Sequence, residues 1–156
     1  MEPQPNELKA IRILYLALLI GQLVFAVIVT VLIESGILSI RNDSLVIPLQ
    51  VIVLLFTAGG IAASIFLFRK RLSNISPGDE LAKKLEKYRA ALILRFALCE
   101  MPTLFAIIAY FITHNLSFLW ITILLIANFI SLYPSGNKIA GQLQLSGAEQ
   151  SALGIV

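Results

Sequence analysis

Charged residues are scarce in this chain of 156 residues. Asp, Glu, Lys and Arg together make up 13% of the sequence, whereas soluble domains carry about 25%. Hydrophobic residues make up 58%, and the mean hydropathy is +0.90. This composition excludes an ordinary soluble domain and predicts a protein that folds in a lipid bilayer.

Cysteine and histidine are rarer still, with one of each, Cys99 and His114. A single cysteine excludes an intramolecular disulfide and a metal site of the CxxC type. His114 falls in a short polar turn, where an exposed structural role is the simplest interpretation. The sequence also lacks the HExxH, GxSxG and P-loop motifs, and no nucleophile is paired with a base. We therefore predict no catalytic residues, no metal, no cofactor and no enzymatic activity.

Long apolar runs account for most of the chain, over residues 13–33, 48–68, 90–112 and 116–133. A helix needs about 20 apolar residues to cross the hydrocarbon layer of a bilayer. The runs predict an all-α membrane protein, a bundle of four transmembrane helices that forms a single membrane domain over residues 1–156. We expect the other runs to pack around the stretch 76–115, which carries the charged groups nearest to a membrane interior.

The basic residues outside these runs are distributed unevenly. Only Arg41 lies in the connection between the first and second runs. The others fall near the N-terminus, in the middle connection or near the C-terminus: Lys9, Arg12, Arg69, Lys70, Arg71, Lys83, Lys84, Lys87, Arg89 and Lys138. Cytoplasmic loops carry the excess of Lys and Arg, so we predict a bacterial inner-membrane protein with both termini cytoplasmic. Orientation in the bilayer explains the formal charge of +3 without a nucleic-acid partner.

A charged segment precedes the third run and is expected to extend its helix into the cytoplasm. Ser76 is a favourable N-cap and Pro77 fits a first helical position, which predicts an extension over residues 77–89. Glu80 and Lys84 have the spacing of an i, i+4 ion pair. The tail, residues 134–156, is polar to mildly amphipathic, and we expect a cytoplasmic surface helix or a disordered end there.

Small residues cluster at the centre of the second run, in the segment TAGGIAAS. Small residues four positions apart let two helices in a membrane approach closely. The pairs are Gly59 with Ala63, Ala58 with Ala62, and Gly60 with Ser64. Two uses fit this pattern, tight packing inside the bundle and an oligomer contact.

Glu100 is the candidate functional residue, because it lies about ten residues inside the third run. A charge at the centre of a membrane helix costs about 2.5–3.5 kcal/mol, and such residues are usually functional. Arg95 lies nearer the interface and can extend its long side chain towards the headgroups. The two residues are five positions apart, so they do not form a good pair on one helix.

The polar side chains closest to Glu100 by depth are Gln22 and Thr57, followed by Asn128. Together with Arg95 they form a candidate intramembrane polar or ion site. Three interpretations are open: a protonated Glu100 hydrogen-bonded to Gln22 as interhelical packing, a proton- or cation-binding site, and a contact with a partner subunit.

The hairpin around Glu100, FALCEMPTLFAIIAYFI, resembles the carboxylate-bearing helix of rotary-ATPase proteolipids. That family forms rings through a glycine-rich first helix, whereas residues 13–33 contain only Gly21. Matches between 16–35 and 96–115 and between 61–68 and 126–133 suggest a duplicated helical hairpin. The segments LYLALLIGQLVFAVI, KYRAALILRFALCE and YPSGNKIAGQLQLS resemble small uncharacterised four-span bacterial membrane proteins, which implies location and architecture but no activity.

Two hypotheses for function follow. The first is a non-enzymatic subunit or accessory factor of a membrane complex, which meets a partner through the exposed 80–89 helix. It allows other membrane subunits or a homo-oligomer beside the lipid bilayer as partners. The second is a proton or cation carrier centred on Glu100.

Overall fold

The computed structural model describes residues 6–36 and 41–155, and every element in these ranges is helical. The all-α class predicted from the sequence is therefore confirmed. The elements in chain order are α1 (Asn6–Glu34), η1 (Asp43–Leu45), α2 (Val46–Leu72), α3 (Leu81–Thr113), α4 (Leu116–Ser131), α5 (Gly136–Leu143) and α6 (Gly147–Ala152).

Three of these helices, α1, α2 and α3, are long and apolar enough to cross a membrane. The fourth, α4, has 16 residues and spans about 24 Å at 1.5 Å per residue, less than the ~30 Å hydrocarbon layer. It passes the same test only together with α5, which is bent from it by 68°. The structure thus has three candidate spans, or up to four, and the length and hydropathy of a multi-pass membrane protein.

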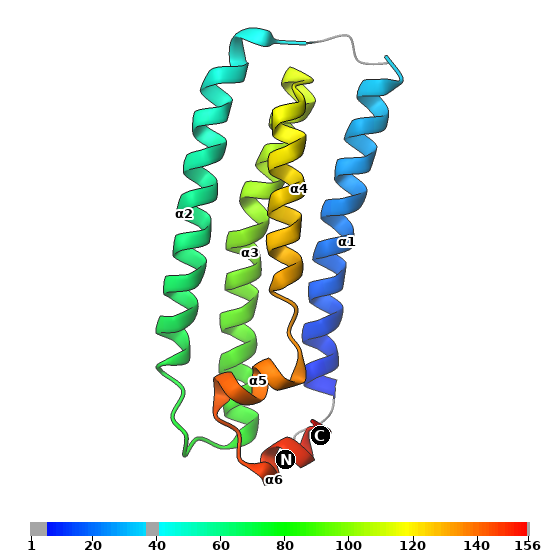
Figure 1. Cartoon of the computed structure of the whole chain (residues 1–156). Helices are drawn as coiled ribbons and strands as arrows, with labels where there is room; N and C mark the ends of the chain where they lie inside the picture. Colours follow the sequence, from blue (N-terminus) through cyan, green and yellow to red (C-terminus); the bar gives the residue numbers. More distant parts are fainter. Residues whose placement is uncertain (1–5, 37–40, 156) are drawn as a thin grey trace.

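The helix α3 is central, because α1, α2 and α4 all pack against it. Figure 1 shows α3 and α4 between α1 and α2. Both chain ends, the α2–α3 connection, α5 and α6 lie at one end of the bundle, which we call the terminal end. The α1–α2 and α3–α4 connections lie at the other, which we call the far end. Most of the basic residues outside the apolar runs therefore lie at the terminal end.

The inner face of α1 follows a seven-residue repeat. Leu8, Ile11, Tyr15, Gln22 and Val29 are its buried residues, and their spacings of three, four and seven place them on one edge. This is the seam that a helix presents to a neighbour in left-handed packing. The opposite side of α1 exposes large apolar side chains, as a helix surrounded by lipid does.

A glycine permits the closest approach between α2 and α3. A Cβ atom added to Gly60 would lie 2.8 Å from the carbonyl oxygen of Leu98 and 2.8 Å from Cγ of Pro102. Pro102 leaves that carbonyl without its usual helical donor, and the bare Gly60 backbone packs against it. Gly60 therefore serves packing inside the bundle. Of the other small residues of this cluster, Ser64 is buried. Ala63 is half-buried, and Ala58, Gly59 and Ala62 are exposed.

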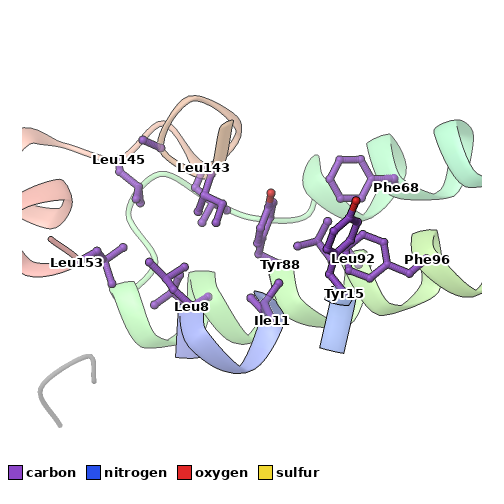
Figure 2. Packing of buried hydrophobic residues seen from close by; sticks show 14 of the residues in the cluster. Leu8, Ile11, Tyr15, Phe68, Tyr88, Leu92, Phe96, Leu143, Leu145 and Leu153 are labelled. Atoms are coloured by element: carbon purple, nitrogen blue, oxygen red, sulfur yellow. The ribbon is translucent and has the colours of Figure 1, made fainter. Parts of the chain in front are cut away.

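The tail differs from the sequence prediction, because it folds back and becomes part of the core. Leu143, Leu145 and Leu153 are buried against Leu8 and Tyr88 (Figure 2). Ser135 caps α5, and Ser146 with Glu149 forms a capping box at the start of α6. The two short helices therefore close the terminal end of the bundle.

The start of α3 was also predicted wrongly. The helix begins at Leu81, with Glu80 at its N-cap position, and Pro77 lies in a turn closed by the Asp79 amide donating to the Ser76 carbonyl at 3.0 Å. The Asp79 carboxylate accepts from the Ser76 amide and from Lys87. These contacts stabilise the turn and displace the first helical residue from Pro77.

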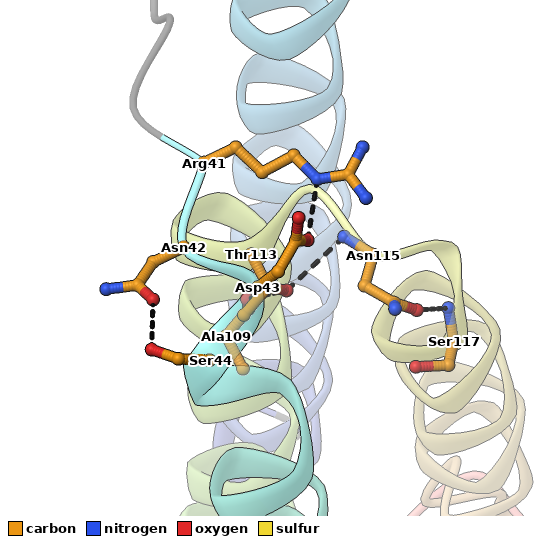
Figure 3. A network of polar contacts seen from close by, with 8 residues as sticks. All are labelled: Arg41, Asn42, Asp43, Ser44, Ala109, Thr113, Asn115 and Ser117. Carbon is orange, nitrogen blue, oxygen red and sulfur yellow. Dashed lines mark hydrogen bonds and ion pairs between the residues drawn. The ribbon is translucent and has the colours of Figure 1, made fainter.

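Polar contacts close the far end (Figure 3). Asn115 caps α4, because its side-chain oxygen accepts from the backbone amide of Ser117 at 2.9 Å. The backbone amide of Asn115 donates to the Thr113 hydroxyl. Arg41 donates to the Asp43 carboxylate at 2.7 Å. The α3–α4 turn therefore needs only two residues between its helices, one of which, His114, adopts a left-handed conformation with φ 53°.

Candidate functional site

Glu100 lies on the outer flank of α3, halfway along the stretch predicted to cross the membrane. Its side chain is half-buried and makes no hydrogen bond or ion pair with any residue in the described ranges. Next to it runs an exposed apolar stripe at helical spacing, formed by Ile93, Ala97, Met101 and Ile108. Met101 is 55% exposed. The carboxylate is therefore open to whatever surrounds the bundle on this face.

Gln22 occupies a different environment from Glu100. Its side chain is 0% exposed, in the middle of the α1 seam, and neither its amide nitrogen nor its amide oxygen has a hydrogen-bond partner among the described residues. The hydrogen bond between Gln22 and Glu100, one of the three interpretations left open by the sequence, is therefore not formed. The reason is rotational: Gln22 points inwards from α1, whereas Glu100 borders the outward face of α3.

Thr57 and Asn128 do not complete the site either. Thr57 is half-buried on α2, and its hydroxyl has no partner within residues 6–36 and 41–155. Asn128 is half-buried on α4, and its backbone carbonyl accepts a hydrogen bond from the Ser131 hydroxyl at 2.6 Å. Among the described residues, the predicted side chains are not joined into one hydrogen-bonded cluster.

Arg95 is packed rather than extended into solvent. Its guanidinium carbon lies 4.5 Å from the centre of the Phe68 ring, a cation–π contact between α3 and α2. The Nε atom of Arg95 is buried and has no hydrogen-bond partner among the described residues. The side chain faces the terminal end of the bundle, where Gln142 of the folded-back tail lines the same space.

Charged groups at the terminal end are paired within the chain. Lys84 is only 2% exposed and donates to Oε1 of Glu149 on α6 at 2.7 Å, in place of the predicted pair with Glu80. This hydrogen bond holds the pKa of Glu149 below its usual value. Lys87 donates to Asp79 at 2.7 Å and lowers the pKa of that carboxyl to about 2.

These pairs change how the start of α3 can meet a partner. Lys84, Leu85 and Tyr88 are buried, and the hydroxyl of Tyr88 donates to Gln142 of α5 at 2.6 Å. The tail therefore covers the face that the sequence hypothesis offered to a cytoplasmic partner. Sequence reasoning did not predict the contacts of Glu149 with Lys84 and of Gln142 with Tyr88. The S-x-x-E spacing of Ser146 and Glu149, however, is typical of a helix capping box.

Metal or thiol chemistry finds no support in the described residues. They contain no group of three His, Cys, Asp or Glu side chains that could hold a metal ion. Cys99 is buried, with its sulfur 3.4 Å from the hydroxyl of Ser64 on α2, and packs as a small side chain. Glu100 can take part in proton exchange or hydrogen bonding. Comparison of the chain with family models, curated proteins and solved structures gave no match.

Proposed function

We propose that this chain is a multi-pass protein of a bacterial inner membrane and a non-enzymatic subunit or accessory factor of a membrane complex. Both termini would lie in the cytoplasm, because the uneven Lys and Arg residues gather at the terminal end and cytoplasmic segments carry that excess. The resemblance to small four-span bacterial membrane proteins supports the same location.

The carboxylate of Glu100, which is half-exposed and has no hydrogen-bond or ion-pair partner among the described residues, carries the proposal. An ionised group at mid-membrane depth costs about 2.5–3.5 kcal/mol, and such groups usually face protein or water. In this chain the group faces neither Gln22 nor Arg95. A transmembrane helix of another subunit, lying on the apolar stripe of Ala97 and Met101 with a hydrogen-bond donor opposite Glu100, would satisfy it.

The interface proposed here replaces the one expected from the sequence. The 80–89 segment has one face covered by α5 and α6, so it offers a partner only its outer side, where Lys83 and Glu86 are exposed. The stripe beside Glu100 is apolar and uncovered. We therefore place the main contact within the membrane and not at the cytoplasmic surface.

A photoreactive residue placed at Ala97 in the native membrane tests this contact. The matched control is Leu124 on α4, which is also apolar and 69% exposed but lies on another helix. The proposal expects a cross-link from position 97 to a second polypeptide and only lipid adducts from position 124. Lipid adducts alone from both positions would contradict it.

A proton or cation carrier remains the second candidate, because Glu100 can bind and release a proton. Reconstituted wild-type protein would then conduct protons or a cation, and Glu100→Gln would abolish the flux while preserving the side chain's shape. The subunit proposal predicts no flux in either protein. It also predicts that Glu100→Gln keeps the cross-link at position 97, because an amide can still hydrogen-bond, whereas Glu100→Leu weakens it.

A further inference from the structure

Two neighbouring cavities at the terminal end share Arg95 and Gln142. The smaller, about 140 Å³, lies between α3, the end of α4 and α5, and Tyr88 and Lys138 contribute to its wall. The larger, about 440 Å³, lies between α2, α3 and α5 and is lined by Ile65, Phe68, Arg69, Leu72, Arg95 and Gln142. Arg95 therefore stands on the boundary between the two.

The walls carry positive charge without a counter-charge. Arg69, Arg95 and Lys138 contribute three cationic side chains, and none of the residues lining either cavity is acidic. The nearby carboxylates of Asp79 and Glu149 are already engaged by Lys87 and Lys84. Arg95 is half-buried, and its buried Nε atom has no hydrogen-bond partner among the described residues. This unsatisfied donor beside uncompensated positive charge points to an anionic ligand.

The polar side chains that line the two cavities can donate hydrogen bonds to a ligand. Tyr88 donates its hydroxyl hydrogen to the side-chain oxygen of Gln142 at 2.6 Å, which leaves the Gln142 amide nitrogen as the group able to donate into the cavities. Lys138 is held in place by the carbonyls of Ser131 and Tyr133 at 2.9 and 3.3 Å. The planar fork of an arginine matches the oxygens of phosphate.

The larger cavity has an apolar wall and an outlet along α2. Ile65, Phe68 and Leu72 form the wall, and Ile65 and Arg69 also line a shallow groove on the outer surface of α2 together with Phe66 and Lys70. A molecule with a phosphate near Arg95 can therefore extend an apolar chain along the outside of α2.

We propose that Arg95, Arg69, Lys138 and Gln142 form a binding site for a phosphate group. The apolar outlet favours the headgroup phosphate of a phospholipid over a soluble phosphate compound. Arg69 lies in the last turn of α2, near the membrane surface. Arg95 lies about one and a half turns inside the surface expected at Arg89, and its long side chain can reach the lipid headgroups from there. The site is independent of the partner contact proposed at Glu100.

Thermal unfolding of the purified, delipidated full-length protein in detergent tests the site. The probes are phosphatidylglycerol, diacylglycerol with the same acyl chains, and inorganic phosphate. Saturating phosphatidylglycerol should raise Tm by on the order of 5 °C. Arg95→Met should weaken its binding by roughly tenfold or more, because a charge-assisted hydrogen bond is lost. The matched control is Arg71→Met, which removes the same charge from α2 outside both cavities.

The outcomes separate the two sources of phosphate. A shift with phosphatidylglycerol that Arg95→Met loses and Arg71→Met keeps supports a lipid ligand. A saturable shift with inorganic phosphate that Arg95→Met loses, without any advantage of phosphatidylglycerol over diacylglycerol, supports a soluble one. If Arg95→Met does not fold, the double variant Arg69→Met/Lys138→Met takes its place. No shift with either phosphate probe, or equal shifts in wild type and variant, would overturn the proposal.

Discussion

The terminal end of the bundle and its middle handle polar side chains in opposite ways. At the terminal end Lys84 finds Glu149 and Tyr88 finds Gln142, both supplied by the folded-back tail. In the middle, Gln22 is buried and has no hydrogen-bond partner within the described residues, and Glu100 is half-buried and unpaired. The folded-back tail supplies partners at the terminal end, whereas Gln22 and Glu100 lie on straight helices and have none among the described residues.

The difference indicates where other molecules complete this protein. Unpaired groups at membrane depth destabilise a lone chain by leaving buried donors and acceptors unsatisfied. A second membrane helix at Glu100 and a phosphate at Arg95 would each supply what the chain lacks. Lys84 and Lys87, by contrast, already have carboxylate partners within the chain.

The largest expected effect comes from the packing that holds the middle together. Gly60→Ala should destabilise the protein by about 1–3 kcal/mol, because the new methyl group meets the Leu98 carbonyl and the rigid Pro102 ring. Gly59→Ala is the matched control, since nothing lies within 4 Å of its added Cβ, and it should be neutral or stabilising. Thermal unfolding in detergent measures both. Equal losses in the two variants would contradict the role assigned to Gly60.

A smaller loss of stability is expected when Lys84, at the terminal end, loses its ionised partner. Glu149→Gln removes the ionised partner of Lys84 and should destabilise the protein by about 1.5 kcal/mol. The control is Glu86→Gln, an exposed residue on the same turn of α3 as Lys84, which should change little. Protease sensitivity of the tail should rise only in the first variant. An unchanged tail would show that the pair does not hold α6 in place.

Removing an unpaired polar group from the middle of the bundle should instead raise the stability of the protein. Gln22→Leu replaces an unpaired buried amide by an apolar group and should stabilise the isolated chain by about 1 kcal/mol. Gln50→Leu is the contrast, because Gln50 donates to the Ser117 hydroxyl at 2.9 Å, and its loss should cost about 0.6 kcal/mol. Unfolding in detergent distinguishes the two signs. Destabilisation by Gln22→Leu would indicate that this amide has a partner after all.

The smallest effect is a dependence on pH confined to the terminal end. Hydrogen bonds from Lys84 and Lys87 lower the pKa of Glu149 and of Asp79, the latter to about 2. Groups with a lowered folded-state pKa contribute stability above their unfolded pKa of about 4, and it is lost as the pH falls through the folded value. Tm should therefore fall between about pH 4.5 and 2. Asp79→Asn should lower Tm at neutral pH and reduce this dependence.

Sequence reasoning recovered the elements whose signal is local. The apolar runs predicted α1, α2 and α3, and the central position of α3 is confirmed by its contacts with all three neighbours. The folding back of the tail was not predictable in this way, because Ile139, Leu143 and Leu153 are too few to define a period. Their burial depends on tertiary contacts with α1 and α3.

The candidate site was only partly predictable for a similar reason. Position along a run gives depth, so Glu100, Gln22 and Thr57 were correctly recognised as polar groups inside apolar helices. Depth does not fix the face of a helix, and the Glu100–Gln22 pairing assumed that both point inwards. The seven-residue spacing of Tyr15, Gln22 and Val29 indicates that Gln22 belongs to a buried seam.

Native mass spectrometry of the assembly extracted from its own membrane in mild detergent tests the central claim most directly. The account predicts a mass that includes a second, different polypeptide, lost or weakened by Glu100→Leu and retained by Glu100→Gln. A single chain carrying only lipid would contradict it and would make proton flux through Glu100 the leading account. A ring of identical chains would contradict it as well and would favour the proteolipid resemblance of the hairpin around Glu100.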